Sequence, residues 1–330
     1  MNTDRAGAED CKGSAKGKKK LMNRTSISWV RNPDGTPGFT WNPLAGCSPA
    51  SAGCSKCYAA RLAATRLAHL PQYAGLAYVD DAEDDAKGRV LDRYHWTGEV
   101  RFFPEKLAEP LRRKKPARVF VGDMGDLFHP QVAKEQIAAV FGVMAACSQH
   151  KFFVLTKRAA RMRGWFEWAK ENTRTSLPNV ALGVTVENQK AADERIPEPL
   201  QTPAAMRFLS IEPVLEHIDL SAFMGGEHVV LPGDRTEPNY NFGIDWVIVG
   251  GESGPHARPC QVEWIRSIVR QCKDAGVPCF VKQLGAYPVF DDPGEKVGKS
   301  LICPNRRNPN SDPAEWPEDL RVRQWPEGWG

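Results

Sequence analysis

The stretch Arg118-Val-Phe-Val-Gly-Asp-Met-Gly-Asp126 shows the pattern that decides the fold of this chain. A short, largely apolar run at 118–121 passes directly into glycines and carboxylates. Continuous apolar runs of this length, bounded by turn residues, are typical of strands that are buried on both faces. The stretch therefore predicts a buried strand whose carboxyl end opens into a polar loop.

Similar apolar runs recur along the chain, with helical patterns between most of them. Apolar residues fall at helical spacing over 137–144 and 262–272, and strands that alternate with helices indicate a parallel sheet covered on both faces. With a further strand at 39–41, the runs make about eight βα units, which predicts an α/β protein with a (β/α) barrel of the TIM type. A partial barrel of six strands with two extra elements fits the same pattern. The other runs lie at residues 100–103, 152–155, 180–184, 206–209, 246–249 and 279–281.

The predicted barrel occupies residues 26–285 and has an appendage at each end. Residues 1–25 are expected to form a disordered basic arm, because they are rich in lysine and glycine and lack an apolar pattern. Residues 286–330 are expected to form a C-terminal extension whose tryptophans pack back onto the barrel. Smaller features are expected at 26–30 (a strand), 32–35 (a turn), 80–88 (an acidic, solvated insert) and 225–243 (a long loop, a candidate lid).

The composition excludes several classes of protein. The 330 residues are 42% hydrophobic and 25% charged, which argues against a wholly disordered, collagen-like or coiled-coil chain. No apolar run reaches the length of a membrane helix and no hydrophobic signal core is present, so we expect a cytoplasmic protein without a membrane partner. The net charge of +4 permits a polyanionic partner without requiring one. The sequence leaves the oligomeric state open.

Polar residues follow nearly every predicted strand. In a barrel all carboxyl ends of the strands share one face, which carries the active site, so we expect the functional site there. The competing explanation for these polar residues is that loops are exposed to solvent and that Asp and Gly are common turn residues. Three cations at the same rim, Lys157, Arg158 and Lys282, are expected to meet phosphates or a carboxylate.

Three of the nine cysteines, Cys47, Cys54 and Cys57, lie together in the loop 47–58. Three thiolates on one loop can converge on a soft metal centre. A zinc site usually needs four ligands, and the loop offers no partner CxxC and no nearby histidine in the sequence. Buried or redox-active thiols are a second alternative. The third is a [4Fe-4S] cluster held by three cysteines, with one iron open to a small-molecule ligand.

A three-cysteine loop directly after the first strand of a βα barrel resembles the radical S-adenosylmethionine superfamily. The usual spacing there is CxxxCxxC, whereas six residues separate Cys47 from Cys54 in this chain. The superfamily also places an aromatic residue just before the last cysteine. Here Lys56 stands at that position, and Tyr58, which follows the cluster, is the residue to which we transfer the aromatic role.

A closer resemblance is to a phage-associated family of three-cysteine, radical S-adenosylmethionine-like proteins, often labelled as of unknown function. It covers most of residues 26–285, and its blocks fall in order at the strand ends. Some members belong to phage pathways that hypermodify thymine in DNA. The blocks are Trp41-Asn-Pro, the cysteine loop with Gly53 and Ala59, Phe120 to Phe128, Leu155-Thr-Lys157, Ser210-Ile-Glu-Pro213 and Val249-Gly-Gly-Glu-Ser-Gly254.

These resemblances imply a radical enzyme whose cofactors are a [4Fe-4S] cluster and S-adenosylmethionine, served by an external electron donor. The substrate we expect from the resemblance is modified thymine in phage DNA. A glycyl group attached to the base would be isomerised from attachment through nitrogen to attachment through carbon. The alternatives are a radical enzyme acting on a small metabolite and a zinc-stabilised, noncatalytic nucleic-acid-binding module. No catalytic residue is assigned. The implied metal ligands are Cys47, Cys54 and Cys57, and the implied cofactor contacts are Tyr58, Asp123, Asp126, Ser210, Glu212, Gly250 and Gly251.

Overall fold

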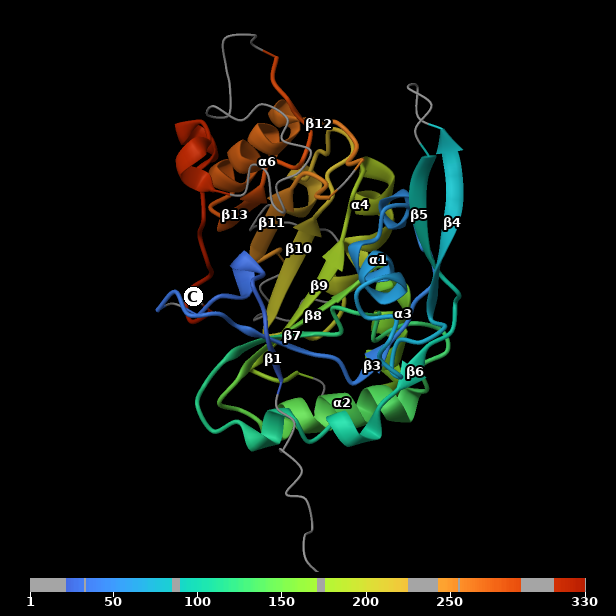
Figure 1. The fold of residues 1–330 in the computed structure, drawn as a ribbon. Coiled ribbons are helices and arrows are strands. Elements are labelled where there is room, and N and C mark those ends of the chain that lie inside the picture. The colour runs from blue at the N-terminus through green and yellow to red at the C-terminus, as the bar shows by residue number, and fades with distance from the viewer. Residues whose placement is uncertain are drawn as a thin grey trace, which may run out of the picture.

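A mostly parallel sheet of eight strands forms the centre of the computed structural model (Figure 1). The structure describes residues 22–32, 34–84, 90–170, 176–224, 243–254, 256–291 and 312–329. The first strand of the sheet is antiparallel to its neighbour and all other pairs are parallel, which confirms the α/β class. In spatial order the strands are β1 (Asn23–Arg24), β2 (Phe39–Trp41), β7 (Arg118–Val121), β8 (Lys151–Thr156), β9 (Val180–Thr185), β10 (Met206–Ile211), β11 (Trp246–Gly250) and β13 (Cys279–Gln283).

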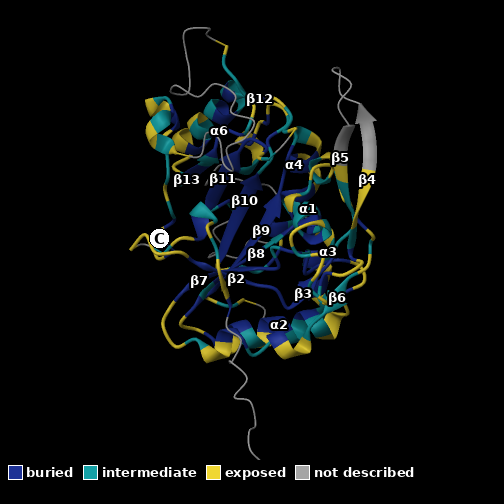
Figure 2. Cartoon of the chain, in the orientation of Figure 1, coloured by how far each residue is buried: buried dark blue, intermediate teal, exposed yellow. Residues whose placement is uncertain are grey.

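Both faces of the sheet are buried, as Figure 2 shows by the dark blue of its central strands. Side chains alternate between the faces along each strand. One face packs with the helices in the larger core, to which Val119 and Val154 belong. The other carries an aromatic cluster that includes Phe153, Phe208 and Trp246. This two-sided burial explains why the strands read as continuous apolar runs.

The helices follow the strands in the order predicted from their spacing. In α2 the four apolar positions at helical spacing are all buried, and the Gln136 side chain accepts a hydrogen bond from the N–H of Ala133 at 2.9 Å. Asn188 caps the next-but-one helix by accepting from the N–H of Ala191 at 2.8 Å. The helices are α1 (Tyr58–Ala64), α2 (Lys134–Ala146), α3 (Ala159–Ala169), α4 (Gln189–Arg195), α5 (Pro197–Leu200) and α6 (Val262–Asp274).

Two predicted strands are wrong in type or place. Residues 26–30 contain a short 3₁₀ helix, Ser28–Val30, because Trp29 and Val30 both pack into the aromatic cluster, and adjacent residues of a strand point to opposite faces. Residues 100–103 form only β6 (Arg101–Phe102), which pairs outside the main sheet with β3 (Leu44–Ala45). The main sheet therefore has seven parallel strands plus the antiparallel β1.

Several smaller elements surround the sheet. The insert predicted at 80–88 is part of a hairpin of β4 (Ala77–Asp84) and β5 (Val90–Trp96), which stands to one side of the sheet in Figure 1; its residues 85–89, the arm up to residue 21 and the loop 225–242 lie outside the described residues. In the C-terminal extension, Trp316 and Trp329 are buried. Two further short strands, β12 (Cys260–Gln261) and β14 (Pro288–Val289), pair with each other. In the described part of the chain no helix is long and apolar enough to cross a membrane.

Candidate functional site

The cysteine loop runs from β3 to the start of α1, beside the carboxyl ends of the parallel strands. The N–H of Gly46 donates to the carbonyl of Met124, in the loop after β7, at 3.0 Å. All three loop cysteines are partly exposed, whereas the other four cysteines that the structure describes are buried. The predicted metal ligands are thus separated by exposure from cysteines that serve as core residues. The four buried ones are Cys147, Cys260, Cys272 and Cys279.

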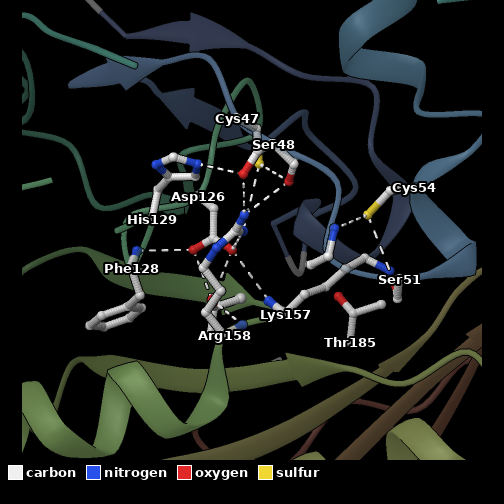
Figure 3. Close-up of polar contacts among 12 residues, drawn as sticks. Cys47, Ser48, Ser51, Cys54, Asp126, Phe128, His129, Lys157, Arg158 and Thr185 are labelled. Carbon is white, nitrogen blue, oxygen red and sulfur yellow. Dashed lines mark hydrogen bonds and ion pairs between the residues drawn. The ribbon is translucent and has the colours of Figure 1, made fainter. Parts of the chain in front are cut away.

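The first attachment of this loop is Arg158, at the end of β8 (Figure 3). Its guanidinium donates to the carboxylate of Asp126 at 2.9 Å, to the carbonyl of Ser48 at 2.9 Å and to the Ser48 hydroxyl at 3.0 Å. It also lies 3.7 Å from the sulfur of Cys47. Asp126 in turn accepts from the Thr156 hydroxyl at 2.8 Å and from the N–H of Phe128 at 2.9 Å. One buried ion pair therefore ties the start of the cysteine loop to two strand ends.

The second attachment is the buried carboxylate of Glu187, after β9. It accepts from Lys157 at 3.1 Å and from Arg195 at 3.0 Å. Burial raises the pKa of Glu187, but the charge of Lys157, a hydrogen bond from Ser51 and the charge of Arg195 together outweigh burial, and the net pKa is lowered. Gly53 of the cysteine loop packs directly on this group, since a β-carbon there would lie 2.8 Å from Lys157 Nζ and 3.2 Å from Glu187 Cδ. The middle of the loop therefore packs closely on a charged cluster, and a larger residue at position 53 would have to displace the Lys157 ammonium group.

The third attachment comes from the loop after β11. Arg258 pairs with Glu252 at 2.6 Å and donates to the carbonyl of Ala52 at 2.9 Å. Lys56 donates to the carbonyl of His256. The three attachments use strand ends that are far apart in sequence, and together they hold the loop along its length. The structure thus supplies the rigid support that a functional loop requires.

The sulfur atoms have protein donors near them. The N–H of Ala50 donates to Cys54 Sγ at 3.4 Å, and Figure 3 shows Cys54 on the Ser51 side of the loop, apart from Arg158. Burial raises the pKa of the Cys47 thiol to about 12, with a further contribution from Asp126, while Arg158 opposes both. The charge of Cys57 also reaches Cys47. Donors of this kind stabilise thiolates once a metal has removed their protons.

The three loop thiols are the donor set that the predicted cluster would use. Among the described residues, no group of three His, Cys, Asp or Glu side chains is arranged around one point as a metal ion needs. A cluster makes a different demand, because each of its cysteines binds a different iron. The loop offers one partly exposed thiol for each of three irons, and the cluster itself stays a prediction.

Ser48 forms a second contact on this loop, with His129. The Ser48 hydroxyl lies 2.8 Å from His129 Nε2, and His129 Nδ1 accepts from the N–H of Gln131 at 3.3 Å. Burial lowers the pKa of His129, and the charge of Arg158 lowers it further. The hydrogen bonds therefore assign a neutral ring with its proton on Nε2, pointing at the serine. A base that activates a serine needs the opposite tautomer, so this pair is no hydrolase nucleophile.

Tyr58 and Asp123 meet on the other side of the loop. The Tyr58 hydroxyl donates to the backbone carbonyl of Asp123 at 2.9 Å. The Asp123 carboxylate accepts from Asn42 at 2.5 Å. Burial raises the pKa of Asp123 to about 6, although the Asn42 hydrogen bond lowers it in part. Tyr58 is 45% exposed, which leaves its ring accessible from solvent.

The remaining predicted contacts lie at the ends of β10, β11 and β13. Glu212 accepts from Lys282 at 2.5 Å, and Ser210 is buried. A β-carbon at Gly250 would lie 3.1 Å from the Gln283 carbonyl, and one at Gly251 would lie 2.5 Å from the Leu284 carbonyl. The two glycines thus permit close packing of strand ends. Their contacts with a cofactor, and those of Asp123, Asp126, Ser210 and Glu212, stay predictions.

The rim cations have partners inside the protein. Lys157, Arg158 and Lys282 pair with Glu187, Asp126 and Glu212 respectively. Of the two roles predicted for them, pairing with a carboxylate is what the structure shows. These carboxylates already compensate the positive charges that would otherwise attract a phosphate.

Sequence reasoning missed the pair of Arg258 with Glu252 and the contact of Ser48 with His129. Arg258 stands six residues after Glu252 in a glycine-rich loop, and no helical or strand spacing relates them. Its other partner, Ala52, is 206 positions away in sequence. The only signal was a cluster of charged residues beside a glycine-rich strand end.

A Gly53→Ala substitution tests the close packing of the loop. The added methyl group would push on Lys157 and weaken its pair with Glu187, so we expect a loss of about 1–3 kcal/mol in the free energy of unfolding. The control is Gly164→Ala in α3, where a β-carbon meets nothing within 4 Å. That change should stabilise the protein by about 0.4–1 kcal/mol. Urea unfolding measures both, and a neutral Gly53→Ala would contradict the packing.

Asp123→Asn tests the raised pKa of Asp123. The folded-state pKa of about 6 lies above the ordinary 3.8, so the folded state binds the proton more tightly. The contribution of Asp123 to stability therefore falls as the pH rises from about 4 to 6 and is then constant. We expect the stability difference between variant and wild type to shift in favour of the variant by up to about 3 kcal/mol between pH 4 and pH 8. A difference independent of pH would contradict the shift.

Comparison with known proteins gives a family and no activity. Residues 24–307 match the family described as "Protein of unknown function (DUF5131)", and the chain belongs to this family. The match spans the whole central sheet and the cysteine loop. No curated protein and no solved structure matches the chain.

Proposed function

We propose that this member of the DUF5131 family is a radical S-adenosylmethionine enzyme that holds a [4Fe-4S] cluster on Cys47, Cys54 and Cys57. The observation that carries the proposal is the cysteine loop itself. Its three thiols are partly exposed while the other described cysteines are buried. Its backbone is fixed by Arg158, and by the ion pair of Arg258 with Glu252.

The finer architecture that we propose is a (β/α) barrel of the TIM or partial-TIM type. Seven parallel strands in consecutive order support it, as does the aromatic cluster on one face of the sheet. On this arrangement the cysteine loop, the rim pairs and the glycine-rich strand end share the face on which barrel enzymes carry their sites. The basic arm at 1–25 and the extension at 286–330 would be appendages of this barrel.

When bound, the cluster and S-adenosylmethionine supply a 5′-deoxyadenosyl radical; the protein supplies binding, orientation and exclusion of water. Cys47, Cys54 and Cys57 would hold the cluster, with Arg158 and the N–H of Ala50 directed at two of the sulfurs. Tyr58 presents an accessible ring for the adenine. The predicted contacts Asp123, Asp126, Ser210, Glu212, Gly250 and Gly251 would surround the rest of the cofactor. An external donor would supply the reducing electron, in the reducing environment of a cytoplasm.

For the substrate we propose a glycyl adduct of thymine in phage DNA, as the family resemblance implies. The reaction would be an isomerisation in which the bond from the thymine methyl carbon to nitrogen breaks, a bond from that carbon to the glycyl α-carbon forms, and one α-hydrogen ends on the nitrogen. The mass of the nucleoside is then unchanged. The glycyl α-hydrogen suits abstraction because nitrogen and carboxylate flank the α-carbon.

A small free metabolite is the second candidate substrate, and one observation favours it. The rim cations Lys157, Arg158 and Lys282 are already paired with carboxylates, so they are poor anchors for a DNA backbone. Phosphate contacts would have to come from elsewhere, and the basic segment Lys16 to Lys20 is one source in the sequence.

Metal content separates the proposal from a zinc-stabilised binding module. Protein purified and reconstituted without oxygen should be brown and contain about four irons per chain. A colourless protein with one tightly bound zinc and no iron would contradict the enzyme.

Nucleoside analysis tests the substrate. Reduced protein would be incubated with glycyl-modified phage DNA and S-adenosylmethionine, and the digested nucleosides compared by mass spectrometry with fragmentation. An isomer of unchanged mass and altered fragmentation supports the proposal. Turnover of small metabolites with the DNA unchanged would show that the metabolite is the substrate.

A further inference from the structure

A pocket lies beside the cysteine loop and is separate from the three cysteines. Its volume is about 240 Å³, and it is bounded by β1, β2, the end of α1 with the turns that follow, and the loop after β7. None of the three loop cysteines lines it. Since a cavity of about 150 Å³ admits benzene, this pocket has room for a molecule the size of an amino acid.

One wall of the pocket is apolar. Leu62, Leu67 and Leu70 line it. The N–H of Leu67 donates to the Leu62 carbonyl, and the N–H of Leu70 to the Leu67 carbonyl, each at 2.9 Å. The three leucines offer apolar surface against which an aliphatic group would bury its own.

The pocket lining also includes an oriented carboxylate. Asp123 lines the pocket and is held by the Nδ2 of Asn42 at 2.5 Å. The Oδ1 of Asn42 accepts from the N–H of Met124 at 3.2 Å, which fixes the direction of the amide. A carboxylate has about four acceptor positions, so Asp123 retains capacity for a ligand donor. Because burial raises its pKa to about 6, a cationic ligand would relieve the cost of its ionisation.

A cation without a partner completes the pocket. Arg66 lines it, and in the described part of the chain no hydrogen bond or ion pair involves the Arg66 guanidinium. It forms no ion pair with Asp123, although both line the same pocket. The guanidinium offers five donors and suits a carboxylate.

We propose that this pocket binds a free aliphatic α-amino acid, with the ammonium group on Asp123, the carboxylate on Arg66 and the side chain against Leu62, Leu67 and Leu70. The inference does not need the cluster, and it assigns the Asp123 carboxylate to a free amino acid in place of the contact with S-adenosylmethionine that the proposed function gives it. A zwitterion satisfies both charges at once. An amine alone would leave Arg66 without an anion. A carboxylate or phosphate alone would be repelled by the Asp123 carboxylate, which lines the same pocket.

Calorimetric titration of the full chain tests the proposal with matched probes. L-Leucine, L-methionine and L-valine would be compared with isoamylamine, which lacks the carboxylate, and 4-methylpentanoate, which lacks the ammonium group. We expect at least one amino acid to bind. Both analogues should bind about tenfold to a hundredfold more weakly than the corresponding amino acid, since each loses one charge-assisted interaction.

Variants assign the binding to the pocket. Arg66→Gln and Asp123→Asn should each weaken the amino acid about tenfold or more. The matched control is Arg61→Gln, which lies in α1, five positions before Arg66 and outside the pocket lining, and should bind as wild type. Arg66 is exposed, so its variant should keep the wild-type unfolding midpoint, and a loss of binding then reports the site rather than the fold.

Three outcomes would overturn the proposal. They are no binding by any of the amino acids at about 10 mM, equal binding of the analogues, and competition by S-adenosylmethionine, which would make the pocket part of the cofactor site. Cys54→Ala should bind the amino acid as tightly as wild type. Failure of the cluster proposal would therefore leave this test intact.

Discussion

Cys54→Ala should lower the iron content of the reconstituted protein from about four per chain to below about one. Removing one of three ligands leaves two thiolates to hold the cluster. The same loss is expected for the visible absorbance of the cluster. Iron and sulfide analysis of protein reconstituted without oxygen measures the effect.

The control for this variant is Cys147→Ala. Cys147 is fully buried in the main core, so its loss should reduce stability while leaving the iron content at the wild-type level. Wild-type iron in Cys54→Ala would remove Cys54 from the ligand set. Equal iron loss in both variants would show that the effect reports damage to the fold.

Arg158→Ala should lower the free energy of unfolding by about 3–5 kcal/mol, because it leaves a buried carboxylate without its cation. The side chains of Arg158 and Asp126 are only 13% and 8% exposed. For a chain of this size the melting temperature should fall by roughly 6–15 °C. The variant also removes both bonds to Ser48, so cluster assembly should be impaired under conditions where the fold is retained.

A surface pair provides the comparison for Arg158. Arg270 donates to Glu263 at 2.6 Å, but the two side chains are 59% and 41% exposed. Arg270→Ala should therefore cost less than about 1 kcal/mol. Differential scanning calorimetry of both variants decides the point. A similar small loss for Arg158→Ala would mean that the pair with Asp126 does not hold the loop.

The strands were predictable because they are buried on both faces. The run at 118–121 corresponds residue for residue to β7, and the run at 279–281 lies within β13. Prediction failed where tertiary contacts overrode the local pattern. Trp29 turns into the aromatic cluster from a 3₁₀ helix, and β6 pairs with β3 instead of the main sheet.

The candidate site also has a part that could be predicted from the sequence and a part that could not. Residue type and spacing were enough to single out the three cysteines. The support of their loop was not predictable, because Lys56 meets His256 and Arg258 meets Ala52 across some 200 positions of sequence. Asp126 was predicted from its place at a strand end, but its partners were not predictable. In the structure its carboxylate accepts from Arg158, Thr156 and the N–H of Phe128, and its contact with a cofactor stays a prediction.

The proposed enzyme must cleave S-adenosylmethionine reductively on a cluster held by the cysteine loop. Chromatographic quantification of 5′-deoxyadenosine and methionine, after reconstituted protein is incubated with dithionite and S-adenosylmethionine without oxygen, measures this reaction directly. We expect both products in equal amounts from wild type and neither from Cys54→Ala. Wild-type protein that carries a full complement of iron and forms no 5′-deoxyadenosine would contradict the proposed enzyme.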